Sequence, residues 1–184
     1  FESHEDAIIE LVNLKNNSCF FYTWHNLLKI KNKKVESLLI KGTFLKNKNT
    51  YKNKHLPIII PKLHKLYRTP FNFYNKLSTS FLLSFYKNIQ ILSSNNKEIS
   101  LDEMLFPLLS NEKYFSLYGI NGFHEVQIII PKKNFSKMFN QIIDYVLKNK
   151  IVIPLASTKL FHGKQELLNF TGSGICLSLN FPRN

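Results

Sequence analysis

The last third of the chain carries the pattern that most restricts its fold. An apolar run at 126–130 is closed by Pro131, and apolar positions with helical spacing follow at 132–149. Two further apolar runs, at 151–161 and 174–181, read as strands, with a turn at 162–164. Residues 122–182 are therefore predicted to form a strand-helix-strand-strand unit.

Residues 4–45 repeat most of this order. Residues 4–15 predict a helix with Ser3 as its N-cap and acidic residues in its first turn. Strands are predicted at 19–24 and 35–45, with a turn at 31–34. The opening strand of this first unit is missing, and its place would lie just before Phe1. We therefore expect the chain to be truncated at its N-terminus and to be a fragment of a larger protein.

Two such units side by side predict an α+β fold. One antiparallel sheet would be covered by helices on one face, and the first β-α-β-β-like unit would lack its opening strand. A helical insertion would join the units, with a polar loop at 46–56 and an aromatic-rich helix at 71–87. The 184 residues fit a single domain, residues 1–184.

The charge of the chain limits its partners. There are 25 Lys and Arg against 12 Asp and Glu, a net charge of +13, yet Arg68 and Arg183 are the only arginines. Specific nucleic-acid readers depend on arginine for bidentate contacts, so this composition argues against such a reader. A basic surface would still attract phosphates or anionic lipid headgroups. A basic module that binds nucleic acid or an anionic membrane is the alternative function.

The same composition bears on where the chain resides. No apolar run approaches the roughly 20 residues of a membrane span, so no span is expected. We expect a cytoplasmic location. If the basic surface binds anionic lipid, we expect peripheral attachment to the inner membrane.

Motifs for catalysis or metal binding are sparse. The six histidines show no HxxxH or HxH spacing, so no metal site is predicted. The glycines at 172 and 174 precede a predicted strand rather than a helix, which indicates a turn instead of a phosphate loop. Cys19 and Cys176 lie in apolar runs, as buried free thiols do. The residues by themselves name no reaction and no catalytic group.

A longer motif gives more. Residues 106–131 read FPLLSNEKYFSLYGINGFHEVQIIIP. This segment is similar to the stretch HPLD…WN..YG..GF.QYQFV.P of the FAD-linked oxidoreductases typified by decaprenylphosphoryl-β-D-ribose oxidase. Residues 157–163 resemble that family's VFKLFG, residues 179–182 its VDFP, and residues 21–24 its YSVAW. The order and spacing of these matches carry the resemblance.

The resemblance implies that the chain is the cap, or substrate-binding, domain of such an enzyme. In this family a separate domain holds FAD, and a sugar or polyprenyl-phosphosugar hydroxyl loses a hydride to the flavin. The flavin loop and the family's C-terminal catalytic lysine segment have no counterpart here. The FAD-binding domain would come from a missing segment or a separate chain, and this chain alone would be inactive and bind no FAD. An inactive remnant of a split gene is the bland alternative.

Two polar residues carry over from the family's pocket. Gln127 stands at the glutamine of YQF, which faces the flavin pocket, and its alternative is a strand residue on a solvated face. Lys159 stands at the lysine of FKLFG, which lines the substrate pocket, and its alternative is an edge lysine in water. We expect Lys159 and Gln127 to face the same concavity, where a sugar phosphate would pair with the ammonium.

Further positions complete the candidate substrate-binding site. Ser178 aligns with the family's pocket cysteine in NICVDFP, and Cys176 is two residues away on the same strand face. Phe161 lies in the FKLFG match as a wall of the pocket. Tyr114 and Tyr118 are further aromatic candidates, for which core packing is the favoured interpretation, as it is for Phe161.

Overall fold

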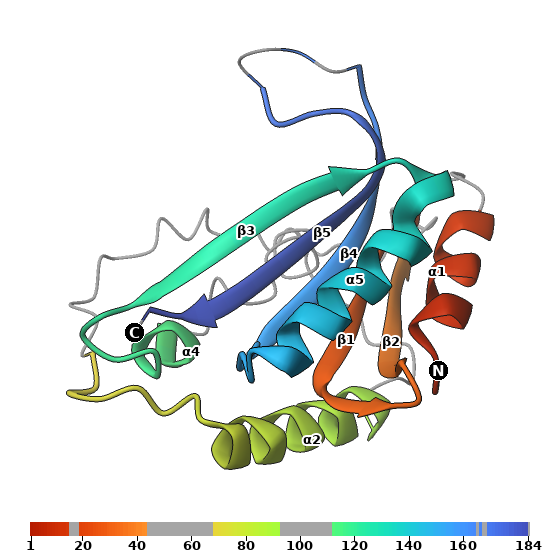
Figure 1. Ribbon diagram of the computed structural model, residues 1–184. Helices are drawn as coiled ribbons and strands as arrows, with labels where there is room; N and C mark the ends of the chain where they lie inside the picture. Colours follow the sequence, from red (N-terminus) through yellow and green to blue (C-terminus); the bar gives the residue numbers. More distant parts are fainter. Residues whose placement is uncertain (15–18, 44–67, 93–111, 165, 167–168, 184) are drawn as a thin grey trace, which may run out of the picture.

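A five-stranded antiparallel sheet organises the chain, as the computed structural model in Figure 1 shows. The structure describes residues 1–14, 19–43, 68–92, 112–164, 166 and 169–183. The strands stand in the order β2-β1-β4-β5-β3. In chain order the elements are α1 (His4–Asn13), β1 (Cys19–Lys31), β2 (Lys34–Thr43), α2 (Lys76–Leu92), α4 (Glu112–Ser116), β3 (Phe123–Ile130), a 3-10 turn (Lys132–Asn134), α5 (Phe135–Lys148), β4 (Leu155–His162) and β5 (Ser173–Pro182). The α+β class predicted from the sequence is confirmed.

Two units of like order make up the sheet. The first runs α1-β1-β2, and the second runs β3-α5-β4-β5, which confirms the strand-helix-strand-strand prediction for residues 122–182. The units meet where β1 pairs with β4 through Thr23 opposite Thr158 and Trp24 opposite Ser157. The seam is short compared with the pairing inside each unit, which extends along most of β1 with β2 and of β5 with β3 and β4.

Phe1 pairs with the outer edge of β2. Its amino group donates to the carbonyl of Ser37, and the Ser37 N–H donates to the Phe1 carbonyl, both at 3.0 Å. Such reciprocal bonds are those of an antiparallel hydrogen-bonded pair. In the second unit β3 holds the equivalent place beside β5. Phe1 therefore lies where the sequence predicts the opening strand, and the strand itself stays a prediction.

The apolar core lies between the sheet and two helices, α1 and α5, which lie on one face (Figure 1). We call this the helix-covered face. On α5 the buried positions follow one another at helical spacing, and alternate residues of β5 point toward them. These core residues include Leu11 of α1, Phe135, Phe139, Ile143 and Val146 of α5, and Ile175, Leu177 and Leu179 of β5.

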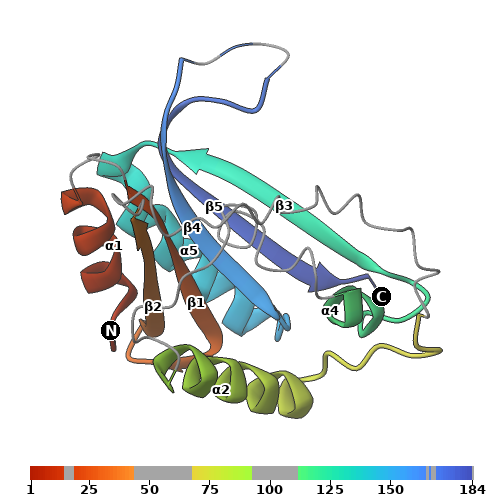
Figure 2. The same cartoon turned by 180° about the vertical axis from the view of Figure 1, so that it is seen from behind.

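The opposite face, which we call the open face, is contacted by α2 and α4 at its two ends (Figure 2). Tyr86 of α2 packs on Trp24 of β1, with ring centroids 5.4 Å apart. At the other end, Tyr118, which follows α4, stacks on Phe123 of β3 at 4.6 Å. In this view none of the described helices lies in front of the middle of β4 and β5, whereas α5 lies behind them.

Most predicted boundaries shift by a few residues, and three shifts have clear causes. β1 continues to Lys31 instead of stopping at 24, because its second half still pairs with β2 beyond an irregularity between His25 and Ile30. The helix predicted at 71–87 begins at Lys76, because the Asn75 side chain accepts hydrogen bonds from the N–H groups of Leu77 and Ser78, both at 3.0 Å. β4 begins at Leu155 rather than 151, directly after Pro154.

Three further local predictions agree with the structure. Ser3 caps α1 by accepting from the N–H of Glu5 at 3.1 Å. The turn at 31–34 is made by Asn32 and Lys33, which both have positive φ, as a tight hairpin requires. The helix at 132–149 starts with the 3-10 turn. The helix α4 was not predicted, and the loop at 46–56 lies outside the described residues.

Candidate functional site

The candidate residues come from three neighbouring strands. Gln127 on β3 pairs with Ser178 on β5, and Lys159 on β4 pairs with Cys176 on β5. Paired residues share a face, and so do residues two apart in one strand, so these side chains all lie on the open face. Phe161, two residues beyond Lys159, lies there too. The register thus places Lys159 and Gln127 on one face, as expected, while their roles in binding stay predictions.

Glu125 joins this set, although the sequence did not single it out. Its Oε1 accepts a hydrogen bond from Gln127 Nε2 at 2.5 Å and another from Ser178 Oγ at 3.0 Å. Glu125 stands two residues before Gln127 on β3, so alternation alone puts both on the same face. That alternation was the signal that could have found it. The contact with Ser178 spans 53 residues of sequence and required the tertiary structure.

Lys159 forms no ion pair with Glu125. Its ammonium lies 6.0 Å from the ring centroid of Tyr22, within reach of a cation–π contact. The side chain is exposed, and no carboxylate of the described residues forms an ion pair with it. Tyr22 is in turn hydrogen-bonded to Tyr86 of α2. The lysine therefore lies next to the wall that α2 contributes to the open face.

Cys176 lies on β5, between the strands that carry Lys159 and Glu125. It is buried and has no disulfide partner among the described residues. Burial raises the pKa of its thiol; the charge of Lys159 lowers this pKa and the charge of Glu125 raises it. The thiol is thus the neutral group on β5 that both charges influence, and it is no candidate nucleophile.

Three tyrosines close the site at the α4 end. The hydroxyls of Tyr114 and Tyr118 are 2.7 Å apart, and the Tyr74 hydroxyl donates to the Tyr114 carbonyl at 3.0 Å. Burial raises the pKa of all three hydroxyls, so they stay protonated. Tyr118 is fully buried, in agreement with the core-packing interpretation. Phe161 lies near the C-terminal end of β4, where its half-buried ring meets Phe170 edge to face at 5.9 Å.

A second polar group lies on the helix-covered face. His25 is buried, its Nδ1 is 2.7 Å from Ser37 Oγ, and its Nε2 is 2.9 Å from Thr23 Oγ1. Because Ser37 Oγ donates to the Val35 carbonyl, it accepts from Nδ1, which leaves Nε2 as the acceptor. Burial, aided by the nearby His4, lowers the pKa of His25 to about 3, so the ring is neutral. Both ring nitrogens are satisfied, and the group is structural.

The glycines of the 106–131 motif have a conformational role. Gly119 and Gly122 have φ of 77° and 72°, which favours glycine. A Cβ on Gly119 would lie 2.7 Å from the Phe71 carbonyl carbon. The turn before β3 therefore requires glycine at these two positions of the motif. Residues 106–111 of the motif lie outside the described residues.

Comparison with family models and with curated proteins identifies no relative. No family model matches the chain, and no curated protein matches it. Within the described residues, no three His, Cys, Asp or Glu side chains gather in a way that could hold a metal ion. The described helices include none with the length and apolar character needed to cross a bilayer.

Proposed function

We propose that this chain is the substrate-binding cap domain of an FAD-linked oxidoreductase that oxidises a hydroxyl of a sugar or polyprenyl-phosphosugar. One observation carries the proposal. Gln127, Lys159 and Ser178, which the resemblance assigns to a pocket, lie on a single face of the sheet. This open face is opposite α1 and α5, which pack on the core, and α2 and α4 contact its two ends.

Each side chain has a role that its chemistry supports. The exposed ammonium of Lys159 would pair with the phosphate of the substrate. Gln127 and Ser178 would hydrogen-bond to sugar hydroxyls or to the edge of the flavin ring, and the half-buried ring of Phe161 would form an apolar wall. Together they would orient the sugar and limit its contact with water.

The open face could also contact the flavin ring of an FAD that is bound by another domain. Gln127 is exposed and offers both amide donor and acceptor atoms to a planar polar ring. The glycines of the sequence form no phosphate-binding loop ahead of a helix, so the pyrophosphate would be held by an FAD-binding domain in another segment or chain. When bound, FAD supplies the hydride acceptor. This chain on its own should bind no FAD.

A second candidate is binding to an anionic membrane surface, and α2 supports it. Leu77, Phe81 and Phe85 are spaced four residues apart and are 84%, 70% and 57% exposed. The charged residues of α2 are lysines, and the chain carries +13 net charge, which complements anionic lipid. Flotation with vesicles that contain or lack phosphatidylglycerol tests this, and binding to duplex DNA at rising salt tests the nucleic-acid alternative.

A chimera tests the main proposal. The cap of a decaprenylphosphoryl-ribose oxidase would be replaced by residues 1–184, and the purified protein would be mixed with polyprenyl-phosphoryl pentose without oxygen. We expect loss of the oxidised-flavin absorbance, and a much slower loss in the Lys159→Met chimera. A chimera that retains FAD but is reduced by neither lipid-linked nor free sugars would contradict the proposal.

A further inference from the structure

The candidate site contains a hydrogen-bond acceptor, the carboxylate of Glu125, whereas a phosphate-binding site is expected to present hydrogen-bond donors. Glu125 already takes the hydrogen bonds of Gln127 Nε2 and Ser178 Oγ on one carboxylate oxygen. Its side chain is exposed, so the remaining lone pairs can accept further hydrogen bonds. At this end of the open face the protein therefore offers negative charge and hydrogen-bond acceptors.

The positive charge lies at a distance from it. Glu125 pairs with Asn180 and Lys159 pairs with Cys176, so the two lie four residues apart along β5 and on opposite sides of it. Strand geometry converts this to about 13 Å along the strand and about 10 Å across the sheet between their backbones. No ion pair joins the two side chains, so neither neutralises the other.

We propose that Glu125 is a specificity-determining residue that sets the orientation of an anionic, hydroxyl-bearing ligand on the open face. The anionic group lies at Lys159 beside Tyr22, and the hydroxyl groups lie at Glu125. A ligand that places a second anionic group at the Glu125 end binds more weakly, because that group would be repelled by the Glu125 carboxylate. This inference rests on the proposed function, since it takes a phosphosugar-like ligand as the occupant.

The charges around the site agree with this division. The tyrosines at the Glu125 end, Tyr114 and Tyr118, have raised pKa values, chiefly from burial and in smaller part from the charge of Glu125. They stay protonated and contribute no second anion. Among the described residues on the open face between α2 and α4, Lys159 is the cation that could receive a phosphate.

Calorimetric titration of the chain with fructose monophosphate and fructose bisphosphate tests the inference. We expect the wild type to bind the monophosphate at least about tenfold more tightly, a difference of about 1.4 kcal/mol. Glu125→Gln keeps the shape of the side chain and removes its charge, so the ratio of the two dissociation constants should fall to about one. Lys159→Met should weaken both ligands together.

Glu166→Gln is the matched control. Glu166 is also exposed and also accepts an amide hydrogen bond, from Asn169 Nδ2 at 2.8 Å, but it lies in the loop between β4 and β5. Its substitution removes the same net charge and should leave the ratio unchanged. If Glu125→Gln keeps the wild-type ratio, the inference about Glu125 is wrong and the proposed function stands. If the wild type binds neither sugar phosphate, the open face is no phosphosugar site and both proposals fail.

Discussion

The two faces of the sheet use polar residues in opposite ways. On the helix-covered face, His25 is enclosed by hydroxyls and both of its ring nitrogens are satisfied. On the open face, Lys159 and Glu125 are exposed and keep unused hydrogen-bonding capacity. Neighbouring residues of β4 show the contrast directly, since Thr158 is fully buried and Lys159 is exposed.

The same strand therefore stabilises the fold through alternate residues and exposes polar groups through the others. A polar group that is already satisfied inside the protein has nothing left to offer a ligand. A polar group that is exposed and unpaired costs little to keep and can bind. The comparison separates polar residues that are satisfied inside the protein from polar residues that are exposed and available, and four experiments can break or sharpen it.

The largest effect should come from the core of the helix-covered face. Phe139 is fully buried on α5 and stacks on Phe135 with centroids 5.4 Å apart. Phe139→Ala should lower the free energy of unfolding by about 3–5 kcal/mol, because it leaves a cavity. Phe81→Ala on α2, where the ring is 70% exposed, should change it by about 0.5 kcal/mol or less. Urea denaturation measures both, and equal losses would show that α2 is buried to the same degree.

Acidification should act through His25. Its pKa is 6.5 when unfolded and about 3 when folded, so the unfolded state binds the proton first and stability is lost as the pH falls below 6.5. Between pH 7 and pH 5 the loss should be about 2 kcal/mol. Denaturant unfolding at the two pH values measures it. His25→Gln should remove this part of the pH dependence, while the exposed His162→Gln should retain it. An unchanged pH dependence in His25→Gln would contradict the assignment.

The adjacent pair on β4 gives the third test. Thr158 is hydrogen-bonded to Thr23 and lies 3.3 Å from His25 Nε2. Thr158→Val keeps the shape but leaves buried partners unsatisfied, so it should cost about 1–2 kcal/mol in thermal or urea unfolding. Lys159→Met should be neutral within about 0.5 kcal/mol or stabilising. A loss of several kcal/mol in Lys159→Met would mean that the lysine belongs to a structural ion pair.

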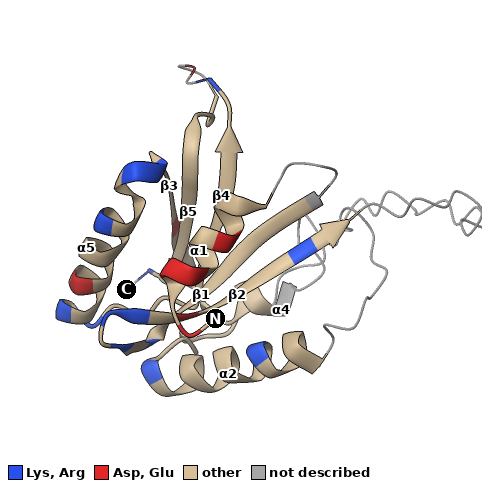
Figure 3. Cartoon of the chain, turned by 90° about the vertical axis from the view of Figure 1, so that its right-hand side faces the viewer, with Lys and Arg blue, Asp and Glu red and all other residues tan. Residues whose placement is uncertain are grey.

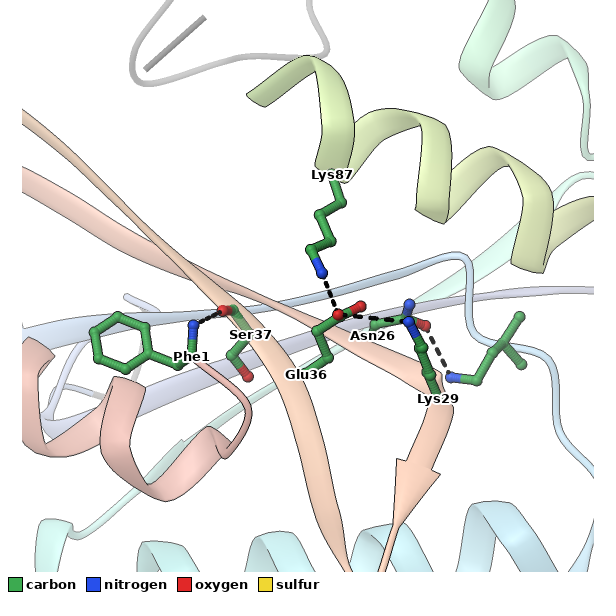
Figure 4. A network of polar contacts seen from close by, with 7 residues as sticks. Phe1, Asn26, Lys29, Glu36, Ser37 and Lys87 are labelled. Carbon is green, nitrogen blue, oxygen red and sulfur yellow. Dashed lines mark hydrogen bonds and ion pairs between the residues drawn. The ribbon is translucent and has the colours of Figure 1, made fainter. Parts of the chain in front are cut away.

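The smallest effect should come from the ion pairs that tie α2 to β2 (Figure 4). Burial raises the pKa of Glu36, but the hydrogen bond and charge of Lys87, with the charge of Lys29, outweigh this and lower it. This stabilisation is present above the unfolded carboxyl pKa and is lost as the pH falls. Lys87→Met should cost about 0.5–1 kcal/mol at low salt and less at high salt. Lys29→Met should cost less, since its ammonium is 3.6 Å from Glu36 and its side chain is 66% exposed. Equal losses would contradict the ranking.

The distribution of charge along the chain shows why net charge alone is a weak guide to function. Figure 3 shows basic residues on α2, on α5 and on the strands, and acidic residues on α1 and α5. Net charge does not tell which lysine lacks an ion-pair partner, and a net charge of +13 is compatible with a phosphate, a lipid or a nucleic acid as the ligand. The position of Lys159 opposite Cys176 and beside Tyr22 distinguishes it from the other lysines.

Local pattern was enough to predict the described elements other than α4. The apolar spacing at 132–149 predicts α5, and the residues before and after it predict β3, β4 and β5, because helical and extended backbones have different periods. The Ser3 cap and the Asn32-Lys33 turn were readable for the same reason, since each depends on a few adjacent residues. Two boundary errors fall where a cap or a proline decides the first residue of an element, at Asn75 and Pro154, and a third falls where pairing with β2 extends β1 to Lys31.

By itself, the sequence determined which residues within one strand share a face, such as Cys176 and Ser178, and, apart from α4, the order of the described helices and strands. Only the tertiary structure decided which strands are neighbours and in what register. That register brings Ser178 to Glu125 across 53 residues and Thr158 to Thr23 across 135. The physical reason is that alternation fixes a side chain relative to its own backbone, whereas pairing between strands depends on the whole buried face against α1 and α5.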